Sequence, residues 1–240
     1  MIVSITIVKY RRLLIPFALF AMALHRIPLM LDKSCTFWKL MGSGKNGKFT
    51  LKPDWQMWVT LAEWKTREDF NRFHQNSLIS SWWSSFSKEQ WTILCEPLAS
   101  HGKWSGKEPF KSTSIIKDSL VSEPIVVLTR ATIRPAKVKS FWSNVGFVSA
   151  IMGKSKGYIT SFSMGEAPFY LQATLSVWET MEDVINFAYK SPEHAEVIRK
   201  TRSENWYTEE LFARFRLVDS YGSLNGKNPL AELQQIEGVI

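Results

Sequence analysis

The sequence has few residues that commonly bind metals or form disulfides: two cysteines and four histidines in 240 residues. Cys35 and Cys95 are sixty positions apart, so they form no CxxC metal knuckle and no disulfide framework. Cys95 lies in an apolar run, which favours a buried small hydrophobic residue over a thiolate ligand. We therefore expect a reducing, cytoplasmic setting.

Clusters of basic residues are also scarce, although the formal net charge is +8 and the pI is about 9.5. Beyond Lys9-Tyr-Arg-Arg12, the lysines and arginines are scattered and form no nucleic-acid-binding motif. This excludes nucleic acid as the expected partner and leaves an acidic electron carrier or an anionic membrane surface. The Gly/Lys-rich residues 42–48 lack the Walker spacing, so they indicate a hairpin loop rather than a phosphate site.

Apolar and aromatic residues are abundant. The chain is 45% hydrophobic and contains eleven tryptophans and fifteen phenylalanines. It can therefore bury a sizeable core, as one large domain or two small ones that pack closely together. The aromatic content fits a pocket for a large apolar or planar ligand, with ordinary core packing as the alternative.

The N-terminus resembles a signal peptide, because basic residues 9–12 precede the apolar residues 13–24. Residues 2–8, however, already have the composition of a β-strand. The twelve-residue apolar run is too short to span a bilayer core of about 30 Å. We expect a strand followed by an amphipathic or buried helix.

An internal repeat organises the chain. Residues 60–77 and 174–191 agree at eight of eighteen positions with an offset of 114, and residues 100–110 match residues 220–230 with an offset of 120. The eight agreements are Thr60/Thr174, Leu61/Leu175, Trp64/Trp178, Thr66/Thr180, Glu68/Glu182, Asp69/Asp183, Phe73/Phe187 and Ser77/Ser191. The change of offset places six extra residues of the second half between Ser191 and Ser220.

Each half indicates the order strand, helix, strand, strand, helix, strand. The predicted class is α+β, with two ferredoxin-like βαββαβ half-units forming a pseudo-symmetric α+β barrel. We expect an N-terminal half at residues 1–105, a linker at 106–123 and a C-terminal half at 124–240. In the second half the expected elements are residues 125–134, 136–148, 158–164, 169–178, 181–202 with a break at Pro192, and 210–218.

The six extra residues lie in the segment that contains His194, and the sequence predicts that this histidine stands at the start of a helix. Ser191 and Pro192 indicate an N-cap and a first helical position, so His194 falls in the first turn, where the helix dipole keeps an imidazole neutral. His194, Val197, Ile198 and Thr201 share one helical face that points inward. His194 is the candidate metal ligand, and a buried histidine bonded to a carbonyl is the alternative.

Five segments resemble the spheroidene monooxygenase family, a group of haem-dependent, carotenoid-oxidising enzymes. They are Phe37-Trp-Lys-Leu-Met-Gly-Ser-Gly44, Leu128-Thr-Arg-Ala-Thr-Ile-Arg-Pro135, Gln172-Ala-Thr-Leu-Ser-Val-Trp178, His194-Ala-Glu-Val-Ile-Arg199 and Trp206-Tyr-Thr-Glu-Glu-Leu-Phe-Ala-Arg-Phe215. The resemblance implies haem b, O2, an electron donor such as reduced ferredoxin, and oxidation at C2 near the end of an acyclic carotenoid. Two successive hydroxylations at one carbon would give a ketone after loss of water.

By this resemblance, His194 is the axial ligand of the haem iron, a role for which His25, His74 and His101 have less support. Arg199 could neutralise a haem propionate, with a solvated surface arginine as the alternative.

Strand alternation places Arg130 on one face with Thr132 and Arg134, and Gln172 on one face of its own strand. Arg130 or Gln172 is the candidate catalytic donor of a hydrogen bond on the O2 side of the haem. The alternative is that the arginines reach solvent or pair with Glu182 or Asp183.

We also expect peripheral contact with the inner face of the membrane, because a carotenoid partitions into lipid. Two other functions remain open at this point: a non-catalytic haem or apolar-ligand carrier, and a cofactor-free α+β barrel oxygenase.

Overall fold

A computed structural model describes residues 1–111, 123–190 and 192–233, except for the side chains of residues 190–194. The first half contains β1 (Ile2–Tyr10), α1 (Ile15–Leu24), α2 (Arg26–Leu31), β2 (Cys35–Gly44), β3 (Pro53–Trp64), α3 (Arg67–Asn76), α4 (Leu78–Phe86) and β4 (Ser87–Gly102). The second half contains β5 (Ile125–Ile133), α5 (Val138–Met152), β6 (Tyr158–Ala167), β7 (Leu171–Trp178), α6 (Met181–Ile185), a π-helical turn (Asn186–Lys190), α7 (Pro192–Ser203) and β8 (Tyr207–Gly222).

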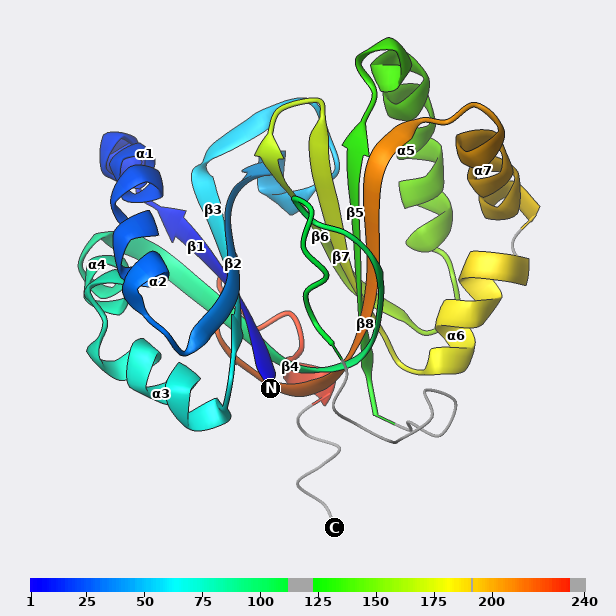
Figure 1. Cartoon of the computed structure of the whole chain (residues 1–240). Coiled ribbons are helices and arrows are strands. Elements are labelled where there is room, and N and C mark those ends of the chain that lie inside the picture. Colours follow the sequence, from blue (N-terminus) through cyan, green and yellow to red (C-terminus); the bar gives the residue numbers. More distant parts are fainter. Residues whose placement is uncertain (112–122, 191, 234–240) are drawn as a thin grey trace.

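The strands close into one antiparallel barrel in the order β1-β3-β2-β6-β7-β5-β8-β4. Each half contributes four strands in the βαββαβ order, and the pairs β2–β6 and β4–β8 join the halves. Helices α1–α4 cover the barrel on one side and α5–α7 on the other (Figure 1). The predicted α+β barrel of two ferredoxin-like halves is confirmed.

Apolar side chains fill the barrel interior, and the two ends are closed by the repeated segments around residues 104–110 and 224–230. Trp104 and Phe110 belong to the interior cluster from one segment, and Leu224 and Leu230 from the other. Each segment contains a matching bridge, Trp104 to Lys107 and Leu224 to Lys227. Pro109 and Phe110 of the predicted linker are thus buried at the barrel, while residues 112–122 lie outside the described residues.

The repeated threonines cap equivalent helices, and the predicted insertion in the second half is confirmed. Thr66 accepts a hydrogen bond from the amide of Asp69, and Thr180 accepts one from the amide of Asp183, each at 3.1 Å. Helix α7 is three residues longer than α4, and residues 204–206 separate it from β8, whereas β4 follows α4 directly. The three additional residues of α7 and the three residues 204–206 together account for the six extra residues.

Three details differ from prediction. The helix that begins after Thr66 breaks at Ser77, whose hydroxyl caps a second helix by accepting from the Ser80 amide at 3.0 Å. The start of the predicted 42–48 loop continues β2 to Gly44. The apolar N-terminal helix is neither buried nor amphipathic: it continues as α2 to Leu31, and Leu13 and Met30 are 91% and 72% exposed.

By length and composition, residues 12–31 form one helical stretch that could cross a membrane. It has 20 residues, and an 18-residue part of it has a mean hydropathy of 1.8, with only 22% of the residues in that part buried.

Candidate functional site

Helix α7 begins at Pro192, as predicted, shortly after the π-helical turn that ends at Lys190. Such turns often mark functional positions, because they interrupt the regular helical ladder. His194 is the third residue of α7, and its side chain lies outside the described residues. Farther along the same face, Val197 packs with Ile133, Phe141, Val145 and Trp206, so this face points toward the barrel.

The sheet surface beneath these helices is only partly covered. In the first half, the paired Thr6 and Thr60 on the outer face of the sheet are 2% and 4% exposed. In the second half, Thr129 and Thr174 form the equivalent pair, and both are only half-buried. The two halves therefore share a scaffold but differ in how tightly the helices cover it.

The packing between helices and sheet differs in the same way. In the first half, the described residues form one continuous apolar cluster that includes Trp64, Phe73 and Trp83. In the second half, the described apolar residues form two separate clusters, one around Met181 and the other around Phe141 and Trp206. We call the half-buried outer sheet surface around Thr129 and Thr174, together with the face of α7 that carries Val197, the α7 site.

Aromatic side chains form one wall of the α7 site. Phe141 contacts Trp142 edge to face, with ring centroids 5.5 Å apart, and Tyr207 at 6.1 Å. Phe49 reaches this wall from the first half and lies 5.8 Å from the Phe141 ring. Burial raises the pKa of Tyr207 to about 12, so its hydroxyl stays protonated and can donate a hydrogen bond.

The predicted distal residues lie on opposite faces of the sheet. Gln172 pairs with Ala131 on the outer face, and its side-chain amide donates to the Ala167 carbonyl at 3.1 Å. Arg130 pairs with Ala173 and points into the barrel, where it is 3% exposed. Of these two, Gln172 alone shares a face with the α7 site.

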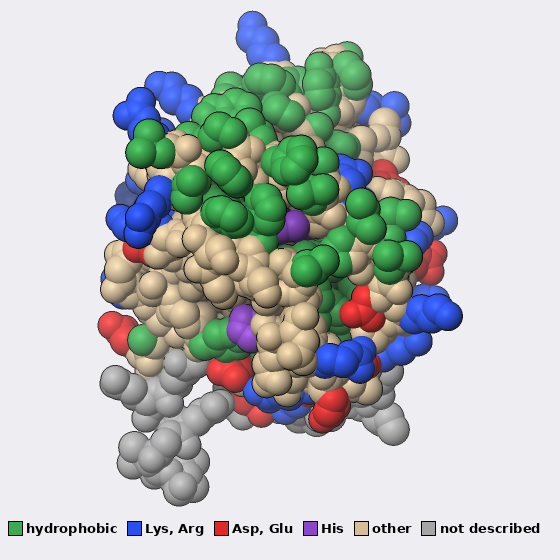
Figure 2. All heavy atoms as spheres, turned by 90° about the vertical axis from the view of Figure 1, so that its left-hand side faces the viewer, with side chains coloured by type: hydrophobic (Ala, Val, Ile, Leu, Met, Phe, Trp, Pro, Cys, Tyr) green, Lys and Arg blue, Asp and Glu red, His purple; other side chains and the backbone are tan. Residues whose placement is uncertain are grey.

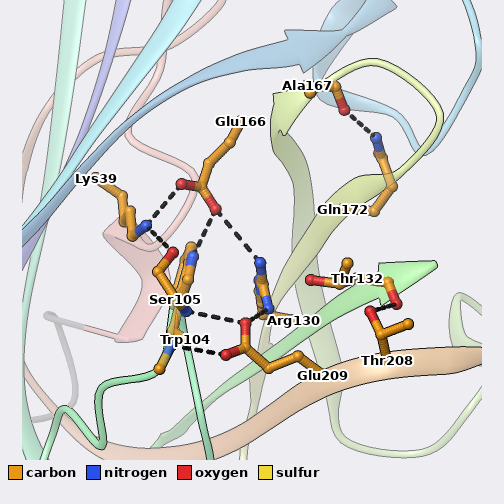
Figure 3. A network of polar contacts seen from close by, with 11 residues as sticks. Lys39, Trp104, Ser105, Arg130, Thr132, Glu166, Ala167, Gln172, Thr208 and Glu209 are labelled. Atoms are coloured by element: carbon orange, nitrogen blue, oxygen red, sulfur yellow. Dashed lines mark hydrogen bonds and ion pairs between the residues drawn. The ribbon is translucent and has the colours of Figure 1, made fainter. Parts of the chain in front are cut away.

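Arg130 belongs to a charged network at one end of the barrel (Figure 3). Its guanidinium donates to Glu209 and lies 3.7 Å from Glu166, over the ring of Trp104. Glu166 also accepts from Trp104 at 2.6 Å and from Lys39 at 2.7 Å. The predicted alternative of pairing with Glu182 or Asp183 is wrong, because the arginine points into the barrel while Glu182 and Asp183 follow β7 in α6.

Glu209 organises this network. Burial raises its pKa, but bonds from the Gly106 and Ser105 amides and from Arg130 outweigh that effect, and the net pKa is lowered. Glu209 therefore stays ionised opposite the buried arginine. The sequence contained a signal for it, because Glu209 stands 120 positions after Glu89, which accepts from the Asn225 and Gly226 amides in the same way. Lys39 and Glu166 have no comparable signal.

The remaining predicted residues are placed as follows. Arg199 is 75% exposed and bonded to Glu196 on its own helix. Arg134 is exposed, and His101 is exposed. His74 stacks on Phe70 with ring centroids 5.6 Å apart.

In the part of the chain that the structure describes, no three His, Cys, Asp or Glu side chains lie close enough to hold a metal ion.

His25 is the most buried of the other histidines. It is 3% exposed and packs edge-on against Trp82 at 5.8 Å, and among the described residues neither ring nitrogen has a hydrogen-bond partner. Burial lowers its pKa from 6.5 to about 4, so the ring is neutral at pH 7. It lies between α1 and α2 and contacts Trp82 and Trp83 of α4, and these helices cover the opposite side of the barrel from α7 (Figure 1).

Comparison with solved structures shows the same fold in an aldoxime dehydratase in complex with butyraldoxime. The TM-score is 0.60 over 97% of this chain and 84% of that one, at 11% sequence identity. This likeness concerns the fold alone.

Comparison of sequences identifies the family. Residues 126–217 match a family described as a domain of unknown function (DUF3291). The spheroidene monooxygenase of Rhodobacter capsulatus is 36% identical over 217 residues, which cover 90% of each chain. That of Cereibacter sphaeroides is 36% identical over 212 residues, covering 88% of this chain and 63% of the relative, so this chain spans less than two thirds of that protein. The chain belongs to the spheroidene monooxygenase family.

Proposed function

We propose that this protein is a haem-dependent monooxygenase that oxidises an acyclic carotenoid at C2, near the end of the polyene. The family supports the carotenoid and the monooxygenation, and the α7 site supports the placement of a flat cofactor. The observation that carries the proposal is the difference between the halves: the Thr6–Thr60 pair is buried, whereas the equivalent Thr129–Thr174 pair is only half-buried, on the side of the barrel that α5–α7 cover.

The residues of the α7 site fit a haem. The aromatic wall of Phe141, Trp142 and Tyr207 offers flat apolar surface, and the half-buried threonines mark a face of the sheet that is covered less tightly than its equivalent in the first half. His194, in the first turn of α7, would be the axial ligand, in a position that favours a neutral imidazole. A haem held there would supply the binding and activation of O2.

Other residues would set the environment of the reacting carbon. Gln172 has one amide hydrogen bonded to Ala167, and its second can point toward the α7 site as the distal hydrogen-bond donor. Arg130 acts from within the barrel and holds the strands through Glu209. Arg199 is committed to Glu196 on the surface, and it would have to leave this partner to neutralise a propionate.

The overall reaction needs an external reductant. Each hydroxylation consumes one O2, two electrons and two protons, inserts one oxygen atom into a C–H bond and releases one water. A second hydroxylation at the same carbon gives a gem-diol, which loses water to leave a ketone. The net charge of +8 favours an acidic donor such as reduced ferredoxin.

A haem titration of the full chain tests the ligand. The parent should develop a Soret band, and His194→Ala should lose it or bind haem far more weakly. His101→Ala is the matched control, because His101 is exposed, and it should titrate like the parent; His25→Ala and His74→Ala should also retain haem. A Soret band of His194→Ala equal to that of the parent in position and intensity would show that His194 is not the ligand.

Turnover tests the reaction. With reduced ferredoxin, ¹⁸O2 and spheroidene, the haem-loaded protein should give a carotenoid that carries ¹⁸O. Haem binding without such a product would instead indicate a carrier, and product without haem would indicate a cofactor-free oxygenase.

A further inference from the structure

The surface of α1 and α2 carries more exposed apolar side chains than any other part of the described chain. Eight of the seventeen large hydrophobic residues that are exposed lie between residues 13 and 31. They are Leu13, Phe17, Leu19, Phe20, Leu24, Ile27, Met30 and Leu31. We call this set the α1–α2 surface. Figure 2 shows hydrophobic side chains gathered over this face, with Lys and Arg side chains at its margins.

These residues are exposed although the helices are firmly packed on the barrel. Ala18, Ala21 and Leu29 are fully buried on the inner side, and the Phe17 ring stacks on Phe86 with centroids 5.0 Å apart. The outward residues are therefore held in place and remain uncovered. An apolar patch of this extent on a folded domain indicates a partner that is itself apolar.

The charges around the surface select the kind of partner. The sequence contains no Asp or Glu before Asp32, whereas Arg11, Arg12, Arg26 and Lys33 flank the apolar residues and are exposed. An apolar face with a basic margin complements a bilayer that contains anionic lipids. A symmetric dimer through the same face would bring these basic side chains near their own copies, which opposes association.

The barrel determines how the helices can meet the membrane. A single crossing by residues 12–31 would put the end of β1 and the start of β2 on opposite sides of the bilayer. Both strands flank β3 in the same closed barrel, so the fold does not allow this. The stretch is long enough to span by composition, but its two ends are tied to one side.

We infer that the α1–α2 surface lies on an anionic lipid bilayer, with both helices parallel to the membrane plane and their outer side chains inserted among the acyl chains. The protein is thereby concentrated at the lipid bilayer, in which apolar molecules dissolve. The inference does not depend on the proposed oxidation, because lipid binding is measured without carotenoid or electron donor.

Vesicle sedimentation of the full chain tests this inference. The parent should bind vesicles that contain about 30% phosphatidylglycerol and bind phosphatidylcholine vesicles less, with weaker binding at high salt. Phe20→Glu and Ile27→Glu, at positions 60% and 58% exposed, should each lower the partition coefficient at least about tenfold. Phe147→Glu, on α5 at a position 52% exposed, is the matched control and should bind like the parent.

Unfolding midpoints in urea should agree among parent and variants, since all three positions face outward. The inference is overturned if the parent stays in the supernatant or if Phe20→Glu and Ile27→Glu bind like Phe147→Glu. It is equally overturned if the parent ignores vesicles and forms a concentration-dependent dimer that Phe20→Glu dissociates, because the surface would then bind a second copy.

Discussion

Protonation of His25 should destabilise the fold by an amount that the structure allows us to estimate. The ring is 3% exposed, lies between Trp82 and Trp83, and has no partner for either nitrogen among the described residues. Burial lowers its pKa from 6.5 to about 4, because an imidazolium there would lose its hydration without gaining a counter-charge.

The sign follows from proton linkage. The folded state binds its proton only near pH 4, whereas the unfolded chain binds one near pH 6.5, so the contribution of the neutral ring is complete above pH 6.5 and is lost as the pH falls toward 4. The shift from 6.5 to about 4 corresponds to about 3 kcal/mol at 1.36 kcal/mol per pKa unit. Below pH 4 the loss should level off.

Urea unfolding at a series of pH values measures this contribution, with His25→Phe as the comparison. Phenylalanine keeps an aromatic ring but cannot titrate, so the free energy of unfolding of the variant minus that of the parent should rise by about 3 kcal/mol between pH 7.5 and 4. At pH 7.5 the variant should be as stable as the parent or more stable, because it removes two unpartnered nitrogens. Carboxylates that titrate in the same range affect both proteins and cancel.

His101→Phe, at an exposed position, should show the pH profile of the parent. If the parent and His25→Phe curves stayed parallel from pH 7.5 to 4, the ring would not be held neutral by burial, and the reasoning would fail.

Three other predictions concern the barrel and helix α5. Arg130→Leu would leave the Glu209 carboxylate without its buried cation, and urea unfolding should show that the free energy of unfolding falls by about 3–5 kcal/mol. Any fall in the turnover of this variant must therefore be corrected for the fraction of the protein that is folded. Gly222→Ala should destabilise by more than about 1 kcal/mol, because φ is +84° and a Cβ would lie 2.1 Å from a carbonyl oxygen of β4. Gly146→Ala, in the open interior of α5, should instead raise the melting temperature; a fall would contradict this account.

The sequence alone was sufficient to predict the architecture, because the signals for helix caps and strand ends are local and occur in both halves. Thr66 and Thr180 cap equivalent helices, and Trp64 and Trp178 end equivalent strands, so a match of eight residues in eighteen revealed two copies of one unit. The start of α7 at Pro192 was predictable in the same way, because a cap and a proline act on the backbone within one turn. The family resemblance then pointed to the carotenoid monooxygenases.

The tertiary structure decided what depends on neighbours far along the chain. Alternation predicted that Arg130 and Gln172 would each lie on one face of a strand, but the register between the strands decided that these faces are opposite. Only closure of the barrel brought Glu166 and Glu209 close to the arginine. The apolar residues 13–24 predicted an amphipathic or buried helix because hydropathy measures composition, whereas exposure depends on whether anything packs on the outer side. Burial and ion pairing are set by contacts distant in sequence, and no local pattern encodes them.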